Sequence, residues 1–465
     1  MQHAMRALAV FVALVVLSGC STYATESARI KQAVAGGDVS GALKVVGEVD
    51  DDDVLGLLQR GLLLFYAGNY EASALTFDRA YQRIDMLYGT DYAKEALSFL
   101  TNDAQRDYVG YPAEQVMLNT YGALGFLADG DLDRALVMAR RANTVLTNLE
   151  RIREDAKGYT DDAFAEWITA MLFAEDGDAN PCMVASRRAL AAFREYEQLW
   201  GQPIPSAFLQ DYAVWSDRFG FPEERAGLAD EFGDIVHNAQ APRRDEGEVL
   251  VIYESGFVTD LQEARLDWPI LESDRDDDDW GRRVYRRGPR GSYVVTDDVK
   301  VKYWLSVAMP VPHHVEPRLV DARVRVGDRV AFTEPVHDVS QIFELTFEEG
   351  ATTRTIRTIV RALAKYKLTQ VVREGKKKDD GSREVNEVAG FVANLFASAT
   401  ERADTRSWTT LPDEIHVARL RLPAGEHRVL LEVLDRSGTV AQTATYETVR
   451  VVAGQRTLLH HRTYD

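Results

Sequence analysis

The chain has 465 residues, of which 46% are hydrophobic and 27% charged, and its formal net charge is −19. Length and composition are those of a globular protein with about two or three domains. The acidic balance disfavours a nucleic-acid partner, because binding to phosphates depends on clustered Lys and Arg. Two cysteines are too few for a disulfide framework.

The first twenty residues have the pattern of an export signal. Arg6 precedes the apolar run Ala7 to Leu17 (ALAVFVALVVL), which is shorter than the roughly 20 residues that span a bilayer. The run leads into Leu17-Ser18-Gly19-Cys20, which resembles the lipobox of bacterial lipoproteins. The resemblance implies that residues 1–19 are a signal peptide and that Cys20 is lipidated. An ordinary secretory signal with an incidental Cys20 is the alternative.

The residue after Cys20 bears on the destination. An aspartate there would suggest retention in the inner membrane, whereas this chain has Ser21. We therefore expect a lipid-anchored protein at the outer membrane that faces the periplasm. No later stretch is long and apolar enough to cross a membrane, so the lipid is the expected attachment.

Residues 20–240 are predicted to form a helical domain with internal repeats. Small and aromatic residues recur at the same spacing around a turn glycine in three copies. The copies contain Gly61, Gly68, Tyr70, Ser73, Phe77 and Ala80; Ala123, Gly130, Leu132, Ala135, Ala139 and Ala142; and Ala170, Gly177, Ala179, Cys182, Ser186 and Ala189. These spacings resemble the tetratricopeptide repeat (TPR), a helix-turn-helix unit of about 34 residues.

The copies depart from that family in two ways. They are unevenly spaced, with an insertion from Asp85 to Pro112, and they lack the proline that commonly closes each repeat. Gly37-Asp38 with Ala42 is interpreted as a degenerate leading copy, and 206–233 as a trailing helical pair that fits poorly. A generic helical bundle is the alternative. Cys182 occupies a small buried position of the repeat, so we expect a structural thiol.

The face expected to be concave is unusually apolar. Repeat geometry assigns to it Leu58, Leu62, Phe65, Met117, Leu124, Leu127, Phe164, Trp167 and Met171. Such a surface is not expected to remain in contact with water. We expect the chain's own insertions or its carboxy-terminal half to cover it, rather than a partner.

The polar segment 237–247 predicts a boundary, after which residues 246–465 read as a mixed β-rich domain. Strands are expected at 249–253, 301–307, 415–422, 428–434, 447–452 and 457–462, with a hairpin around Gly327-Asp328 within 319–333. Two amphipathic helices are predicted at about 351–372 and 385–401, joined by a charged loop. The last sixty residues resemble the small β-sandwich modules of bacterial surface proteins. The predicted fold class is therefore α+β and multidomain, a TPR-like helical array followed by a mixed α/β region with a β-sandwich-like end.

The two halves behind a lipobox, with Ala403 to Trp408 (ADTRSW) leading into Leu411-Pro412, resemble a family of uncharacterised bacterial lipoproteins. The resemblance covers nearly the whole mature chain and implies no established activity. It suggests a role in envelope or peptidoglycan maintenance.

No catalytic residue, cofactor site or metal site is predicted. The chain lacks a G-x-S-x-G elbow, an H-E-x-x-H motif, a phosphate-binding loop and a dinucleotide fingerprint. Asp274 with Asp276 to Asp279 is interpreted as an exposed acidic loop rather than a calcium site, and Asp50 to Asp53 as charge at a helix start. Neither adjacent pair, His313-His314 or His460-His461, can chelate a metal alone, because neighbouring strand residues face opposite ways.

The preferred hypothesis is a membrane-anchored, non-enzymatic scaffold whose partners are envelope proteins or cell-wall material. Trp408, Trp280 and Tyr293 are candidate anchors for a partner, with core packing favoured for Trp408. The alternative is an enzyme that acts on the cell wall or a surface polymer, with paired carboxylates or a histidine in a cleft.

Overall fold

The computed structural model describes residues 22–98, 107–152, 159, 161–271, 301–349 and 403–464. Several predictions concern residues outside these ranges: the signal peptide and Cys20, the helices at about 351–372 and 385–401, the acidic loop, Trp280 and Tyr293. No helix in the described part of the chain is long and apolar enough to cross a membrane.

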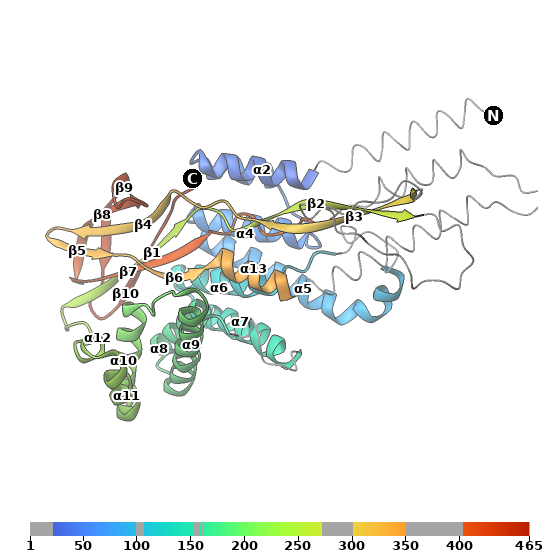
Figure 1. Ribbon diagram of the computed structural model, residues 1–465. Helices are drawn as coiled ribbons and strands as arrows, with labels where there is room; N and C mark the ends of the chain where they lie inside the picture. Colours follow the sequence, from blue (N-terminus) through green and yellow to red (C-terminus); the bar gives the residue numbers. More distant parts are fainter. Residues whose placement is uncertain are drawn as a thin grey trace, which may run out of the picture.

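The helical half consists of consecutive helical pairs, as the repeat pattern predicts (Figure 1). The pairs are α2 (Thr22–Ala35) with α3 (Val39–Val46), α4 (Val54–Tyr66) with α5 (Tyr70–Ser98), α6 (Pro112–Ala128) with α7 (Leu132–Ile152), α8 (Ala163–Asp176) with α9 (Ala179–Trp200), and α10 (Ser206–Phe219) with α11 (Pro222–Phe232), followed by the short α12 (Asp234–His237). The leading and trailing copies are therefore both helical pairs.

A glycine with positive φ opens the turn of each of these five described pairs. The φ angles are 77° at Gly37, 75° at Gly68, 85° at Gly130, 82° at Gly177 and 81° at Gly220. Because only glycine adopts this conformation without strain, the glycine spacing marks where each hairpin folds back.

Small residues let the paired helices approach closely. A Cβ atom at Gly61 of α4 would lie 2.6 Å from Cε1 of Phe77 on α5. The hydroxyl of Ser73 donates a 2.7 Å hydrogen bond to the Gly61 carbonyl oxygen across the same contact. The predicted insertion after Asp85 begins as a continuation of α5, which has 29 residues.

Two four-stranded sheets follow. The inner sheet has the order β10-β1-β7-β6 and the outer sheet the order β5-β4-β8-β9. The strands are β1 (Glu246–Ser255), β4 (Leu319–Val326), β5 (Arg329–Phe332), β6 (Glu334–Asp338), β7 (Glu414–Pro423), β8 (Gly425–Asp435), β9 (Val440–Val451) and β10 (Arg456–Arg462). Strands β2 (Asp260–Leu271) and β3 (Val301–His313) form a separate long ribbon, and α13 (Val339–Glu349) follows β6.

The inner sheet is covered on both faces. Val249, Val251 and Tyr253 of β1 pack against the outer sheet and form the sandwich core. Leu250 and Ile252 alternate with them and belong to the core that the helical pairs form. Burial on both faces explains why this strand is a continuous apolar run. The helices end at His237 and strands begin at Glu246, yet one continuous core includes residues from both halves.

The predicted hairpin around Gly327 is confirmed as β4 and β5. The turn between β7 and β8 connects strands of different sheets, so it joins the two layers rather than closing a hairpin. The last strand, β10, runs parallel to β1 instead of pairing with β9. Its end brings the C-terminus beside α2, where Tyr464 packs against the small core that contains Ile30 and Val34 (Figure 1).

Candidate functional site

The apolar concave face is covered by the chain itself, as predicted. Eight of its nine predicted residues are at most 4% exposed, and Leu127 is half-buried. The covering residues come from the β-rich half and include Ile252, Phe343, Trp408, Ile415 and Val417. The surface that a repeat array commonly offers to a partner is therefore occupied within this protein.

Trp408 is fully buried in this interface, which confirms core packing as its role. Its ring lies 5.6 Å from that of Phe77 and 6.3 Å from that of Tyr121, measured between centroids. Its backbone N–H donates a 2.6 Å hydrogen bond to Oε1 of Glu114 on α6. The segment that begins at Ala403 thus inserts between the helices and is not an anchor for an external partner.

Glu114 is a buried carboxyl that the sequence did not single out. Tyr108 donates to its Oε2 from the phenol hydroxyl, and Tyr111 from the backbone N–H at 2.8 Å. Burial raises the pKa of Glu114 to about 7, although these hydrogen bonds and that of Trp408 favour the charged form.

A second buried carboxylate, Glu254 on β1, connects helices α4 and α6 to the inner sheet. The hydroxyls of Tyr66 and Tyr121 each donate a 2.7 Å hydrogen bond to it. Nε2 of His460 lies 3.2 Å from Oε2, and Nη1 of Arg462 lies 3.6 Å from the same oxygen. Burial opposes ionisation, yet the charges of His460 and Arg462 hold the pKa of Glu254 below its ordinary value.

At the other end of β1, Glu248 takes part in a buried ionic network with Asp211 of α10. Arg456 Nη2 lies 2.6 Å from Asp211 Oδ1 and 2.9 Å from Glu248 Oε2, and Arg419 also pairs with Asp211. The indole N–H of Trp167 donates to Asp211 Oδ2 at 3.0 Å. Burial opposes the charge, but Arg419 and Arg456 lower the pKa of Glu248 to about 2.

An open groove of about 490 Å³ remains where β10 passes the turns of the hairpins. Its floor is apolar and includes Phe65, Leu124, Leu127 and Met171 of the predicted concave face together with Leu458 of β10. Tyr70, Glu175, Gln455, Arg456 and His460 add polar groups to its walls. We call this depression the β10 groove.

Strand β10 is an edge strand beside this groove. Glu248 N–H donates to the carbonyl of Gln455, and Thr463 N–H donates to the carbonyl of Glu254. In a parallel ladder the bonded residues alternate, so the odd-numbered residues of β10 bond to β1. The N–H and C=O groups of Arg456 and Leu458 therefore point to the open edge, and no described residue hydrogen-bonds to them.

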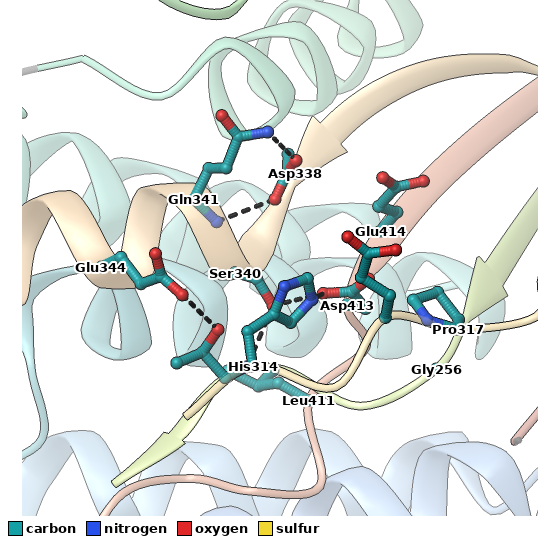
Figure 2. A network of polar contacts seen from close by, with 12 residues as sticks. Gly256, His314, Pro317, Asp338, Ser340, Gln341, Glu344, Leu411, Asp413 and Glu414 are labelled. Atoms are coloured by element: carbon teal, nitrogen blue, oxygen red, sulfur yellow. Dashed lines mark hydrogen bonds and ion pairs between the residues drawn. The ribbon is translucent and has the colours of Figure 1, made fainter. Parts of the chain in front are cut away.

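A serine, an aspartate and a histidine meet at the start of α13, as Figure 2 shows. The Ser340 hydroxyl donates to Asp413 Oδ1, and His314 Nε2 lies 2.8 Å from the same oxygen. A nucleophilic serine needs the histidine between itself and the carboxylate, whereas here the carboxylate lies between the two. Ser340 and Asp413 are each 2% exposed. The network fastens α13 to the turn before β7 and offers no nucleophile.

Burial raises the pKa of Asp413 to about 6, with Asp338 and Glu414 adding to the effect. Gly256, at φ 58°, closes the network from the β1 side, because a Cβ there would lie 3.1 Å from that of Asp413 (Figure 2). The cluster of Ser340, Asp413 and His314 is therefore explained by the packing of α13 against the turn before β7.

The remaining predicted candidates do not converge. His460 faces the helices and Glu254, whereas His461 faces Tyr253 and Tyr446 in the sandwich. His313 contacts Asp260, away from both. No group of metal ligands occurs among the described residues. Cys182 is fully buried, and burial raises the pKa of its thiol to about 12, which confirms a structural role.

Asp53 confirms the interpretation of the acidic run before α4. It caps the helix by accepting a 3.0 Å hydrogen bond from Gly56 N–H. The sequence did carry one overlooked signal: Glu248 and Glu254 flank the apolar core of β1 in the register that faces the helices.

No protein-family model matches the chain, and no curated protein sequence matches it. Solved structures that match include the 41-end segment of MamA from Desulfovibrio magneticus RS-1, at 14% identity and a TM-score of 0.29, covering 45% of this chain and 92% of that one. A putative kinesin light chain of Podosopora anserina with nearly identical TPR-like repeats matches at 11% identity and a TM-score of 0.31, covering 47% and 97%. Scores this low carry no argument about function. The TPR-like character of the helical half rests on its own hairpins and turn glycines.

Proposed function

We propose that this protein is a lipid-anchored scaffold of the bacterial envelope that binds an extended segment of a partner protein in the β10 groove. The observation that carries the proposal is an open strand edge directly beside an apolar groove. An extended segment can add to such an edge through backbone hydrogen bonds while alternate side chains enter the neighbouring pockets.

The chemistry of the groove favours a particular kind of segment. The half-buried Leu127 and Leu458 of the groove lining suit apolar side chains at alternate positions. Tyr70 and Glu175, on the walls, suit polar groups between them. A folded helix would leave the outward N–H and C=O of Leu458 without partners, so a strand is the better fit.

The sequence supports the anchor. The signal pattern and Cys20 place lipid at the start of the mature chain, and Ser21 favours the outer membrane on its periplasmic side. The first described helix begins at Thr22, which supports a folded body held close to its membrane. Its partners are then envelope proteins or cell-wall material at that surface, and a role in envelope maintenance follows.

Substitution of the lipidated residue tests the anchor. The Cys20→Ser variant should move from the membrane fraction to the soluble fraction after cell lysis, while wild type stays with outer-membrane vesicles. A Cys182→Ser variant serves as the matched control, because that thiol is buried, and it should stay with the membranes. Membrane retention of Cys20→Ser would remove the anchor from the proposal.

Photocrosslinking in intact cells tests the groove. A photoreactive side chain at Leu127 should capture a partner, whereas one at Val137, 43% exposed on α7 and outside the groove, should not. The crosslinked peptide is then synthesised and titrated against the purified chain.

A proline at the strand edge makes this test specific for backbone pairing. Leu458→Pro removes an outward N–H that β1 does not use, and prolines are tolerated at such edges. Leu458→Ala removes the same side chain but keeps the N–H. The affinity of the synthetic peptide for Leu458→Ala should be at least about tenfold higher than its affinity for Leu458→Pro. Equal affinity would reject strand addition.

A further inference from the structure

A cavity of about 350 Å³ lies between the α6–α7 and α8–α9 hairpins. Its lining includes Arg140 and Asn143 of α7, Glu166 and Phe173 of α8, and Arg188 of α9. We call it the Glu166 pocket.

The pocket is separate from the β10 groove. Glu166 and Phe173 lie seven residues apart and share one face of α8. Met171 and Glu175, which line the β10 groove, lie on the opposite face of the same helix. A ligand in the Glu166 pocket would not compete directly with a segment along β10.

Among the described residues, no donor meets hydrogen-bond geometry with three buried acceptor atoms in this pocket. They are both carboxylate oxygens of Glu166, which is fully buried, and Oδ1 of Asn143. Arg188 lies 3.2 Å from Oε1 as an ion pair, but its guanidinium also binds Asp161 at 2.6 Å and 3.0 Å. Buried polar atoms in folded proteins nearly always have a partner, so this concentration of acceptors indicates a site for a donor-rich group.

The rest of the lining has the opposite character. Arg140 is exposed, lies with its guanidinium 5.3 Å from the Phe173 ring centroid, and forms no ion pair with any described residue. Phe173 and Val184 supply apolar surface. One pocket therefore combines a buried acceptor group, an apolar wall and an exposed guanidinium.

We propose that the Glu166 pocket binds a small zwitterion of the α-amino acid class, with its ammonium at Glu166 and Asn143 and its carboxylate at Arg140. An ammonium carries three donors and matches the three acceptors that lack one. Arg140 can bind a carboxylate through two parallel N–H groups. The volume lies at the lower end of the range for small-molecule sites and suits a free amino acid or a dipeptide.

Proton release accompanies this binding. Burial raises the pKa of Glu166 to about 8; Arg188 and the nearby Asn143 side chain oppose the rise, whereas Asp161 and Asp162 add to it. The carboxyl is therefore mostly protonated in the free protein at neutral pH. An ammonium beside it favours the ionised form, so the ligand displaces a proton and binds more tightly as pH approaches 8.

Calorimetric titration of the detergent-solubilised full-length chain tests the proposal. The probes are L-alanine and L-leucine, together with leucinamide, which lacks the carboxylate, and N-acetyl-leucine, which lacks the ammonium. The affinity for at least one of the two zwitterions should be at least about tenfold higher than the affinity for either analogue. Titration in two buffers of different ionisation enthalpy should show a proton released on binding.

Two variants assign the binding to this pocket. Glu166→Gln retains a neutral side chain of the same shape, so the free protein should melt as wild type does, but the zwitterion should bind at least about tenfold more weakly. Glu175→Gln, on the opposite face of α8, is the matched control and should bind normally. Unchanged binding by Glu166→Gln would overturn the proposal. So would the absence of a melting-temperature shift with every protein amino acid at millimolar concentration.

Discussion

The hydroxyl of Tyr121 donates a 2.7 Å hydrogen bond to Oε1 of Glu254, across 133 residues of sequence. Tyr121 belongs to the α6–α7 hairpin and Glu254 to β1 of the inner sheet, and both are 1% exposed. This bond lies within the interface that covers the concave face. The β-rich half is therefore part of the helical array's core rather than an appendage to it.

Substitutions at this contact should differ in cost. Tyr121→Phe removes one hydrogen bond and should lower the free energy of unfolding by about 1 kcal/mol. Glu254→Ala leaves the buried Arg462 without its carboxylate and should cost about 3–5 kcal/mol. Urea unfolding of the purified variants measures both values.

The exposed pair Arg428–Glu447, with side chains 66% and 72% exposed, provides the control. Glu447→Ala should change stability by no more than about 0.5 kcal/mol. A Glu254→Ala variant as stable as this control would show that the buried charges contribute nothing.

Removal of the β-rich half should expose the concave face. A chain that ends at Gln240 loses Ile252, Ile415 and Trp408 from the shared core and uncovers Phe65 and Leu124. We expect the fragment to bind a hydrophobic dye and to self-associate in size-exclusion chromatography. A monomeric fragment that does not bind the dye would contradict the shared core.

Much of this architecture is predictable because local signals determine it. Turn glycines such as Gly68 and Gly130 mark the hairpins, and the apolar surplus on one helix face indicates that something covers it. What covers it was predictable only in part, since strand pairing between distant segments has no local signature. The parallel pairing of β10 with β1 and the ribbon of β2 and β3 went unpredicted for this reason.

The candidate site also has parts that local sequence signals predict and parts that depend on contacts between distant segments. Four apolar residues of the β10 groove were assigned to the concave face from repeat spacing, whereas its edge strand depends on sheet order. The Glu166 pocket was not predicted at all. A glutamate such as Glu166, within the mostly apolar helix α8, is ambiguous until its neighbours on α7 and α9 are known.

Stability should depend on pH through Glu114. Its pKa in the folded protein, about 7, is raised above the ordinary 4.5. Its contribution to stability is therefore greatest below pH 4.5, declines as pH rises to about 7, and is constant above that. The total loss is on the order of 3 kcal/mol at 1.36 kcal/mol per pKa unit.

A Glu114→Gln variant isolates this effect. Gln cannot titrate, so the difference in free energy of unfolding between wild type and variant should decline between pH 5 and pH 7. The raised pKa values of Asp413 and Glu166 contribute a slope of the same sign to both proteins and cancel in the difference. A difference that is independent of pH would show that Glu114 is charged in the folded protein.

Two glycines at helix contacts should respond differently to alanine. A Cβ at Gly61 would lie 2.6 Å from the ring of Phe77, which is fully buried, whereas a Cβ at Gly122 would lie 2.3 Å from Cε of Met138. The methionine end can rotate away at little cost, but the phenylalanine ring is rigid and its surroundings are closed. The contact at Gly122 is therefore expected to cost less stability than the contact at Gly61, although it is shorter.

We expect Gly61→Ala to lower the free energy of unfolding by about 1–3 kcal/mol and Gly122→Ala to change it by less than about 1 kcal/mol, in part because alanine favours the helix. Urea denaturation gives both values. The double variant Gly61→Ala/Phe77→Leu makes room for the new methyl group and should be less destabilised than the sum of its two single variants. If the double variant were destabilised by the simple sum of the two single changes, the cost of Gly61→Ala would not arise from the contact between α4 and α5.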